Sequence, residues 1–204
     1  MTGPAAGTRQ PVFTRAVEGF GTVTLSPVDP AADAALIHGW VSQERARFWG
    51  MTGAGPDLVR EIYEDVDRRT THHAFIARRD GVPVGLFQTY ECAEDRVSEC
   101  YEAQPGDTGV HVLLAPAGPG AGAEHGFSAM LIGLFLAFVR SDGTTRRIVA
   151  EPDARNTKAI ARLERSGFTL GPEVELPEID LPEVHLPAKR ARLAFLGGPL
   201  PEGR

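Results

Sequence analysis

The sequence EPDARNTKAIARLERSGF, residues 151–168, directly follows the apolar run RIVA at 147–150. We expect a strand over 147–150 that leads through an Asn-bearing turn into a short basic helix over about 156–165. Gly167 is placed to end that helix. Such a unit can hold polar groups and positive charge beside an anionic ligand.

The spacing of apolar residues predicts further elements on both sides of this unit. Asp29-Pro30 is a helix start, and Asp80-Gly81 is a hairpin turn signal. Strands are expected over 21–26, 73–77, 84–89, 108–115, 168–174 and 189–196, and helices from 30, over 57–69 and over 127–140. This order predicts an α/β (α+β) fold, with a central mixed, mostly antiparallel sheet and helices on both faces.

The 204 residues fit one domain. Residues 1–10 are rich in Gly, Ala, Thr and Pro and are expected to form a flexible tail, with a single domain over 11–204. Residues 176–187 hold most of a near-repeat, LPEID-LPEVH-LPAKR, whose prolines predict an extended connector. A cover over a groove and a contact in a homodimer are the alternatives for this repeat.

Composition excludes several classes of protein. The net charge of −6 argues against a nucleic-acid partner. The longest apolar run, 127–139, is too short to span a bilayer, and the N-terminus has no signal-peptide pattern, so we expect a cytoplasmic protein without a membrane partner. Cys92 and Cys100 have no metal-site spacing, and no metal is predicted. Of the 21 basic residues only Lys158 and Lys189 are lysines.

The segment AGPGAGAEHGF, residues 117–127, is a glycine-rich loop that opens an apolar helix. Free backbone N–H groups at such a helix start can bind phosphate, although a loop of this composition is also common without a ligand. No Arg or Lys lies between Ala115 and Met130. Phosphate charge would therefore be met by backbone amides, by His125 or by arginines elsewhere.

Three motifs together resemble the GCN5-related N-acetyltransferases (GNAT), and in particular the siderophore-pathway hydroxylamine acyltransferases of aerobactin, mycobactin and desferrioxamine assembly. They are GDTGVHVLL at 106–114, EPDxRN at 151–156, and HxW at 38–40 followed by RxxFW at 45–49. The resemblance covers roughly residues 23–196. The glycine loop departs from the usual pattern of that superfamily, in which Gln or Arg precedes spaced glycines.

The resemblance implies the GNAT fold and an acyl-CoA N-acyltransferase. The co-substrate would be acetyl-CoA or another short acyl-CoA such as succinyl-CoA. The acceptor would be a small hydroxylamine of the N-hydroxycadaverine, N-hydroxylysine or N-hydroxyornithine type, and the product a hydroxamate. It also implies site residues: catalytic His111 and Asp153; cofactor-binding Leu113, Leu114, Gly120, Gly122, Gly126, Phe127, Asn156, Lys158 and Arg162; and substrate-binding His38, Trp40, Arg45, Phe48, Trp49, Gln88 and Tyr90.

Elementary chemistry agrees with this assignment. A hydroxylamine is mostly neutral near pH 7, so its acylation needs only a proton acceptor, and a His/Asp pair supplies one. The residues also allow simpler interpretations. His111 could be a hydrogen-bonded strand residue, and Asp153 or Asn156 could cap the following helix. The basic helix could be a solvated face, and the N-terminal aromatics could belong to the core.

Two other functions stay open at this point. An aminoglycoside-type N-acetyltransferase would share the fold and the N-terminal aromatic motif. A non-catalytic acyl-CoA-binding partner of a siderophore synthetase would account for the irregular glycine loop.

Overall fold

The computed structural model describes residues 9–117, 124–181 and 184–197. The chain forms two compact units, and some strands and one helix contribute residues to both. One unit comprises Met1–Gln88 and Val112–Leu131, and the other comprises Thr89–His111 and Ile132–Arg204. The predicted single domain over 11–204 stays a prediction. Arg9, in the predicted tail, forms an ion pair with Asp67. No helix among the described residues is long and apolar enough to cross a membrane.

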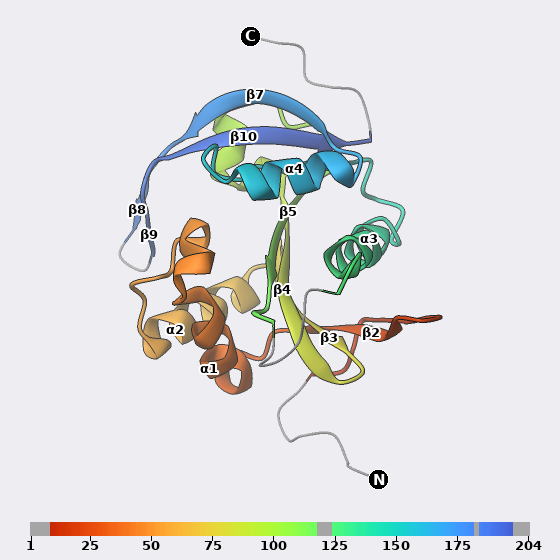
Figure 1. The fold of residues 1–204 in the computed structure, drawn as a ribbon. Helices are drawn as coiled ribbons and strands as arrows, with labels where there is room; N and C mark the ends of the chain where they lie inside the picture. The colour runs from red at the N-terminus through yellow and green to blue at the C-terminus, as the bar shows by residue number, and fades with distance from the viewer. Residues whose placement is uncertain (1–8, 118–123, 182–183, 198–204) are drawn as a thin grey trace. The chain divides into compact units, whose positions relative to one another are not determined.

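Eight strands form one mixed sheet in the order β1-β2-β3-β4-β5-β6-β10-β7. Strands β5 and β6 are parallel, whereas the pairs β1–β2, β2–β3, β6–β10 and β7–β10 are antiparallel. The predicted mixed α/β fold is therefore confirmed. Figure 1 shows β7 and β10 side by side as long arched strands in the second unit.

The first unit holds β1 (Phe13–Val17), β2 (Gly21–Pro27), α1 (Pro30–Val41), a 3-10 segment (Glu44–Trp49), α2 (Pro56–Arg68), β3 (His72–Arg79) and most of β4 (Val82–Glu91). The predicted helix start is confirmed, because the side chain of Asp29 accepts from Ala31 N. The predicted hairpin turn is also confirmed, since Asp80 and Gly81 both have positive φ, as a two-residue turn requires.

The second unit holds two 3-10 turns (Cys92–Glu94 and Arg96–Glu99), most of β5 (Asp107–Leu114) and much of α3 (Phe127–Val139). It continues with β6 (Arg147–Ala150), α4 (Thr157–Arg165), β7 (Thr169–Leu176) and β10 (Lys189–Leu196). Gly167, with φ +89°, ends α4 as predicted. Its N–H and that of Phe168 bond back to Glu164 O and Leu163 O, the pattern of a Schellman motif.

Two elements differ from the prediction. The sequence does not indicate strand β1, because FTRAV is largely exposed and shows no apolar alternation. The predicted connector at 176–187 contains a separate two-stranded sheet, β8 (Ile179–Leu181) paired with β9 (Val184–Leu186). Each strand is only three residues long and lies between prolines, so the missing proline N–H groups do not interrupt its ladder.

Each unit has its own buried apolar cluster. In the first unit, the cluster includes Ile37, Trp40, Tyr63, Ile76 and Leu86. In the second, it includes Tyr90, Val149, Leu176, Leu193 and Phe195. The second cluster underlies the parallel β5–β6 pair and so supports the residues at the ends of these strands.

Candidate active site

The register between β5 and β6 brings His111 to Glu151. Asp107 lies opposite Arg147, and Gly109 lies opposite Val149. Continuing this register by two residues reaches His111 and Glu151, whose side chains point to the same face of the sheet. His111 Nε2 lies 2.6 Å from Glu151 Oε1. The parallel strands therefore present an imidazole and a carboxylate as a bonded pair.

Glu151 is buried, yet three polar groups surround its carboxylate. The hydroxyl of Tyr90 donates to Oε2 at 2.7 Å, and Lys189 Nζ lies 3.6 Å from Oε1, the oxygen that His111 contacts. Burial alone would raise the pKa of Glu151, but the charges of His111 and Lys189 and the two hydrogen bonds hold this pKa well below its ordinary value. Glu151 is therefore ionised, although its side chain is only 4% exposed.

Tyr90 reaches Glu151 by lying across β5. A Cβ atom at Gly109 would coincide with the ring of Tyr90, so only glycine leaves room for the ring at this position. The Tyr90 ring also lies 5.0 Å from the His111 ring, centroid to centroid. Burial and the nearby Glu151 raise the pKa of Tyr90 well above its ordinary value. Its hydroxyl therefore stays protonated and serves as a donor to Glu151.

This arrangement defines the chemistry available to His111. An ionised carboxylate only accepts, so Nε2 of His111 donates the hydrogen bond to Glu151. The His111 side chain is 36% exposed, in contrast to Glu151. A partly exposed imidazole held by a buried carboxylate can accept a proton from a ligand, with the imidazolium stabilised by Glu151.

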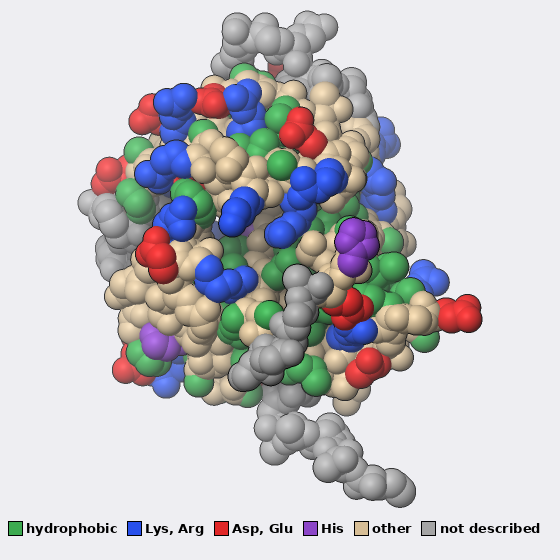
Figure 2. All heavy atoms as spheres, in the orientation of Figure 1, with side chains coloured by type: hydrophobic (Ala, Val, Ile, Leu, Met, Phe, Trp, Pro, Cys, Tyr) green, Lys and Arg blue, Asp and Glu red, His purple; other side chains and the backbone are tan. Residues whose placement is uncertain are grey.

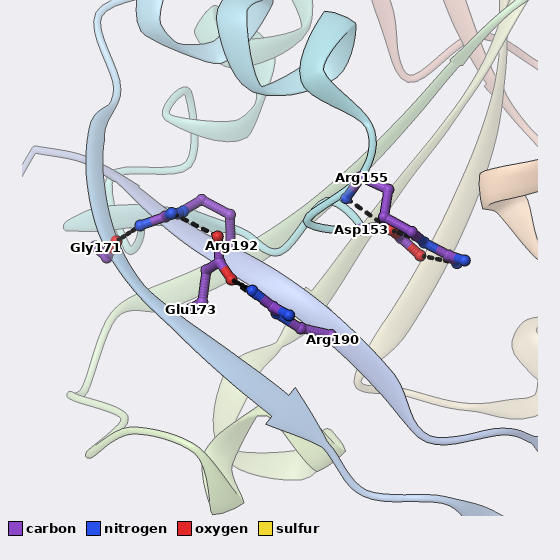
Figure 3. A network of polar contacts seen from close by, with 6 residues as sticks. All are labelled: Asp153, Arg155, Gly171, Glu173, Arg190 and Arg192. Atoms are coloured by element: carbon purple, nitrogen blue, oxygen red, sulfur yellow. Dashed lines mark hydrogen bonds and ion pairs between the residues drawn. The ribbon is translucent and has the colours of Figure 1, made fainter.

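The structure does not bring Asp153 and His111 together as a bonded pair. Both oxygens of Asp153 accept from Arg155, at 2.9 Å from Nε and 2.8 Å from Nη2 (Figure 3). These hydrogen bonds hold the pKa of Asp153 below its ordinary value, although burial opposes them. The carboxylate at His111 is Glu151, because the strand register, and not the motif, selects the partner. A catalytic role of Asp153 stays a prediction.

Two arginines of β10 are engaged beside this region. Glu173 on β7 pairs with Arg190 and, at 2.6 Å, with Arg192 Nη2 (Figure 3). Arg192 Nη1 also donates to Gly171 O at 3.1 Å. Glu173 therefore bonds to two cations of β10 and compensates one of their two charges, while Lys189 on the same strand faces Glu151.

The predicted cofactor residues of the second unit lie on α4 or at its start. Asn156 caps the helix, and its side-chain oxygen accepts from Ala159 N at 3.2 Å. Lys158 is exposed and Arg162 is half-buried. Figure 2 shows Lys and Arg side chains gathered where Figure 1 draws α4. The helix thus presents positive charge, and contacts of Asn156, Lys158 and Arg162 with a cofactor stay predictions.

In the first unit, Gly126 precedes α3 with φ +79°, and Gly120 and Gly122 lie outside the described residues. Phe127 packs on Phe20, with 5.6 Å between ring centroids. Arg79 lies over both rings and pairs with Glu124, immediately before the helix. The charge of Arg79 is thus compensated by Glu124, a residue of the glycine-rich segment itself.

Leu113 and Leu114, the other predicted cofactor residues, end β5. Leu113 belongs to the buried cluster of the first unit. The carbonyl of Leu114 accepts from Arg45 Nη2 at 2.7 Å. Arg45, predicted to bind substrate, therefore ties the 3-10 segment Glu44–Trp49 to the end of β5.

The remaining predicted substrate residues are dispersed. Trp40 is buried in the core, His38 is half-buried on α1, and Phe48 packs under the guanidinium of Arg47. Two of them converge on Tyr63, whose hydroxyl accepts from Trp49 and, at 3.3 Å, from Gln88 Nε2. Tyr90 lies in the second unit and binds Glu151. Their contacts with a substrate stay predictions.

The two cysteines do not have the surroundings of reactive thiols. Cys92 and Cys100 are free, and burial raises the pKa of Cys92 to about 12, which disfavours a thiolate. Within 9–117, 124–181 and 184–197, no three His, Cys, Asp or Glu side chains are grouped as a metal site would require.

Solved structures with the same fold include acetyltransferases. The chain superimposes on the aminoglycoside acetyltransferase AAC(6')-Ib in complex with coenzyme A with a TM-score of 0.69 and 24% identity, covering 86% of this chain and 94% of that one. An uncharacterized protein from Bacillus halodurans gives a TM-score of 0.74 and 22% identity, covering 92% of each chain. Residues 29–176 match the family described as an acetyltransferase (GNAT) domain. The chain belongs to this family.

Curated relatives extend the comparison. The chain is 32% identical over 143 residues to N(6)-hydroxylysine O-acetyltransferase of Escherichia coli, covering 69% of this chain and 44% of that protein. It is 30% identical to N-hydroxyputrescine acetyltransferase of Acinetobacter baumannii, covering 69% and 65%. It is 29% identical to an aminoglycoside N(6')-acetyltransferase type 1 of Klebsiella pneumoniae, covering 67% and 69%. The matches thus span less than two thirds of both hydroxylamine-related proteins.

Proposed function

We propose that the chain is an acyl-CoA-dependent N-acyltransferase that converts an N-hydroxylated diamine or amino acid to a hydroxamate in siderophore biosynthesis. The observation that carries the proposal is the 2.6 Å contact between His111 and the buried carboxylate of Glu151. The motifs around His111 and the names of two relatives, an N(6)-hydroxylysine O-acetyltransferase and an N-hydroxyputrescine acetyltransferase, support this acceptor class.

His111 would act on the acceptor nitrogen. The nitrogen forms a bond to the thioester carbonyl carbon, the carbon–sulfur bond breaks, and coenzyme A leaves as the thiol after taking up a proton. The imidazole of His111 accepts the proton that the nitrogen loses, while Glu151 stabilises the imidazolium. A hydroxylamine suits this base because it is already neutral near pH 7 and needs no prior deprotonation.

The residues present fit an acyl-CoA. Its phosphates are anionic, and α4 offers the cations Lys158 and Arg162. Gly126 allows the backbone to turn into α3 and direct N–H groups outward. An acetyl or a succinyl group is compatible with these residues.

Acylation of purified acceptors tests the proposal. We expect acyl-CoA-dependent turnover of at least one of N-hydroxycadaverine, N-hydroxylysine and N-hydroxyornithine, and a loss of about 10²-fold or more in His111→Ala. His73→Ala is the matched control, since His73 is an exposed histidine of β3. Turnover within a few-fold of wild type in folded His111→Ala would exclude His111 as the base.

The aminoglycoside acetyltransferase alternative is favoured by the extent of one match, which covers 69% of the Klebsiella protein. Kanamycin and related aminoglycosides, measured beside the hydroxylamines, separate the two functions. Turnover of aminoglycosides alone would replace the proposed function. Tight acyl-CoA binding by calorimetry without turnover of any acceptor would instead indicate a non-catalytic acyl-CoA-binding protein.

A further inference from the structure

Each carboxylate of the EPD motif has its own cation. Lys189 Nζ lies 3.6 Å from Glu151, and Arg155 Nη2 lies 2.8 Å from Asp153. Both carboxylates are buried, whereas Arg155 is exposed and Lys189 is 23% exposed. Within each pair the cation compensates the charge of the carboxylate, so the EPD motif leaves no uncompensated negative charge beside His111.

Lys189 is also close to the reaction centre. Its Nζ and His111 Nε2 lie 3.6 Å and 2.6 Å from the same oxygen of Glu151, so the two nitrogens are within about 6 Å of each other. Lys189 begins β10, where it pairs with Leu176 of β7. This pairing fixes the start of β10, and with it the ammonium beside the imidazole.

A cation here acts differently on the two classes of acceptor nitrogen. An alkylamine is protonated near pH 7, and its ammonium group gains no net attraction from a carboxylate that Lys189 already compensates. Glu151 would attract the same ammonium group if Lys189 were absent, whereas Asp153 would stay paired with Arg155. A hydroxylamine nitrogen is mostly neutral, and Lys189 neither repels nor attracts it strongly.

We propose that Lys189 determines acceptor specificity by compensating the charge of Glu151, so that the reacting position offers a protonated amine no net attraction and the site selects a hydroxylamine. The inference rests on the proposed function and deepens it. Among the described residues of the second unit, the ionisable groups bonded around this position are Tyr90 on β4, His111 on β5, Glu151, Asp153 and Arg155 after β6, and Lys189 on β10. Cys92 and Asp95 also act electrostatically on Tyr90. The neighbouring Arg190 and Arg192 pair with Glu173.

The test is the ratio of kcat/KM for N-hydroxycadaverine to kcat/KM for cadaverine. In Lys189→Met we expect this ratio to fall about tenfold, mainly through a lower KM for cadaverine. Lys189→Arg should keep the wild-type ratio, because the charge is retained. Arg190→Met is the matched control: it removes one positive charge from the next residue of β10, and we expect an unchanged ratio.

A double variant separates the effect on the kcat/KM ratio from a general loss of activity. Glu151→Gln with Lys189→Met removes both charges of the pair, so the ratio should return toward that of wild type although turnover of both acceptors falls. An unchanged ratio in folded Lys189→Met would overturn the role of Lys189 while leaving the proposed function intact. A wild-type enzyme that prefers cadaverine would overturn the proposed function itself.

Discussion

The ring of Tyr90 lies over Gly109, and this overlap lets its hydroxyl cross β5 to Glu151. Replacement of Gly109 by alanine would force the ring away. We expect Gly109→Ala to lower the free energy of unfolding by about 1–3 kcal/mol and to reduce kcat, because Glu151 loses a donor. Urea unfolding and turnover measure the two effects.

Gly133→Ala is the control for this prediction. Gly133 lies in α3, and a Cβ atom added there would meet no atom within 4 Å. Alanine at this position should therefore leave activity unchanged and stabilise the helix by up to about 1 kcal/mol. Equal stability of Gly109→Ala and wild type would mean that Tyr90 can move without cost.

Glu151 and Asp153 should differ in their effect on catalysis. In Glu151→Gln the imidazolium of His111 loses its anionic partner, and we expect kcat to fall about 10²-fold with the fold retained. Asp153→Asn weakens only the contacts with Arg155, so its kcat should stay within about tenfold of wild type. Steady-state kinetics of both variants, with circular dichroism as the folding control, ranks the two carboxylates. A larger loss in Asp153→Asn would reverse this assignment.

Acid should remove the stability that ionised Glu151 contributes. Because the pKa of Glu151 is lowered in the folded protein, this contribution is complete above its ordinary value of 4.5 and is lost as the pH falls toward the folded-state pKa. We expect wild type to exceed Glu151→Gln by about 1–3 kcal/mol at pH 7, and the difference to shrink between about pH 5 and pH 3. Urea unfolding at several pH values measures it. A difference that grows in acid would contradict the lowered pKa.

The buried pair at the other end of β5 and β6 should affect stability alone. Arg147 and Asp107 are bonded at 2.6 Å, and Tyr101 and Gln104 also donate to Asp107. Arg147→Met leaves a buried carboxylate without its cation, and we expect a loss of about 3–5 kcal/mol with unchanged kcat per folded molecule. The double variant with Asp107→Asn should recover part of this stability. A loss below about 1 kcal/mol would show that the pair is dispensable.

Local signals account for the parts of the fold that the sequence predicts well. Asp29, Asn156 and Gly167 act on helix ends within one turn, and Asp80-Gly81 forms its hairpin from two residues. The exposed strand β1 has no such signal, because its stability comes from pairing with β2. The repeat at 176–187 shows that prolines between short segments still permit a hairpin.

In the candidate site, too, local signals predict some residues, whereas the pairing of distant segments determines the others. The contiguous motif at 106–114 is enough to predict His111 as a site residue. The basic character of α4 is likewise evident from its own residues. Glu151 stands in the EPD motif, yet its role depends on strand register, which no local pattern specifies. Lys189 comes from a strand far along the chain, and only its rarity beside the many arginines sets it apart.

The two charge pairs between β5 and β6, Asp107 with Arg147 and His111 with Glu151, are both separated by 40 positions. This equality follows from the parallel register, so an insertion or deletion in the intervening connection would change both separations by the same amount. In a relative with a loop of another length, the partner of the histidine can therefore be located by counting from the acidic and basic residues that begin the two strands. The separation between Asp107 and Arg147 therefore gives the separation between the histidine and the carboxylate that supports it.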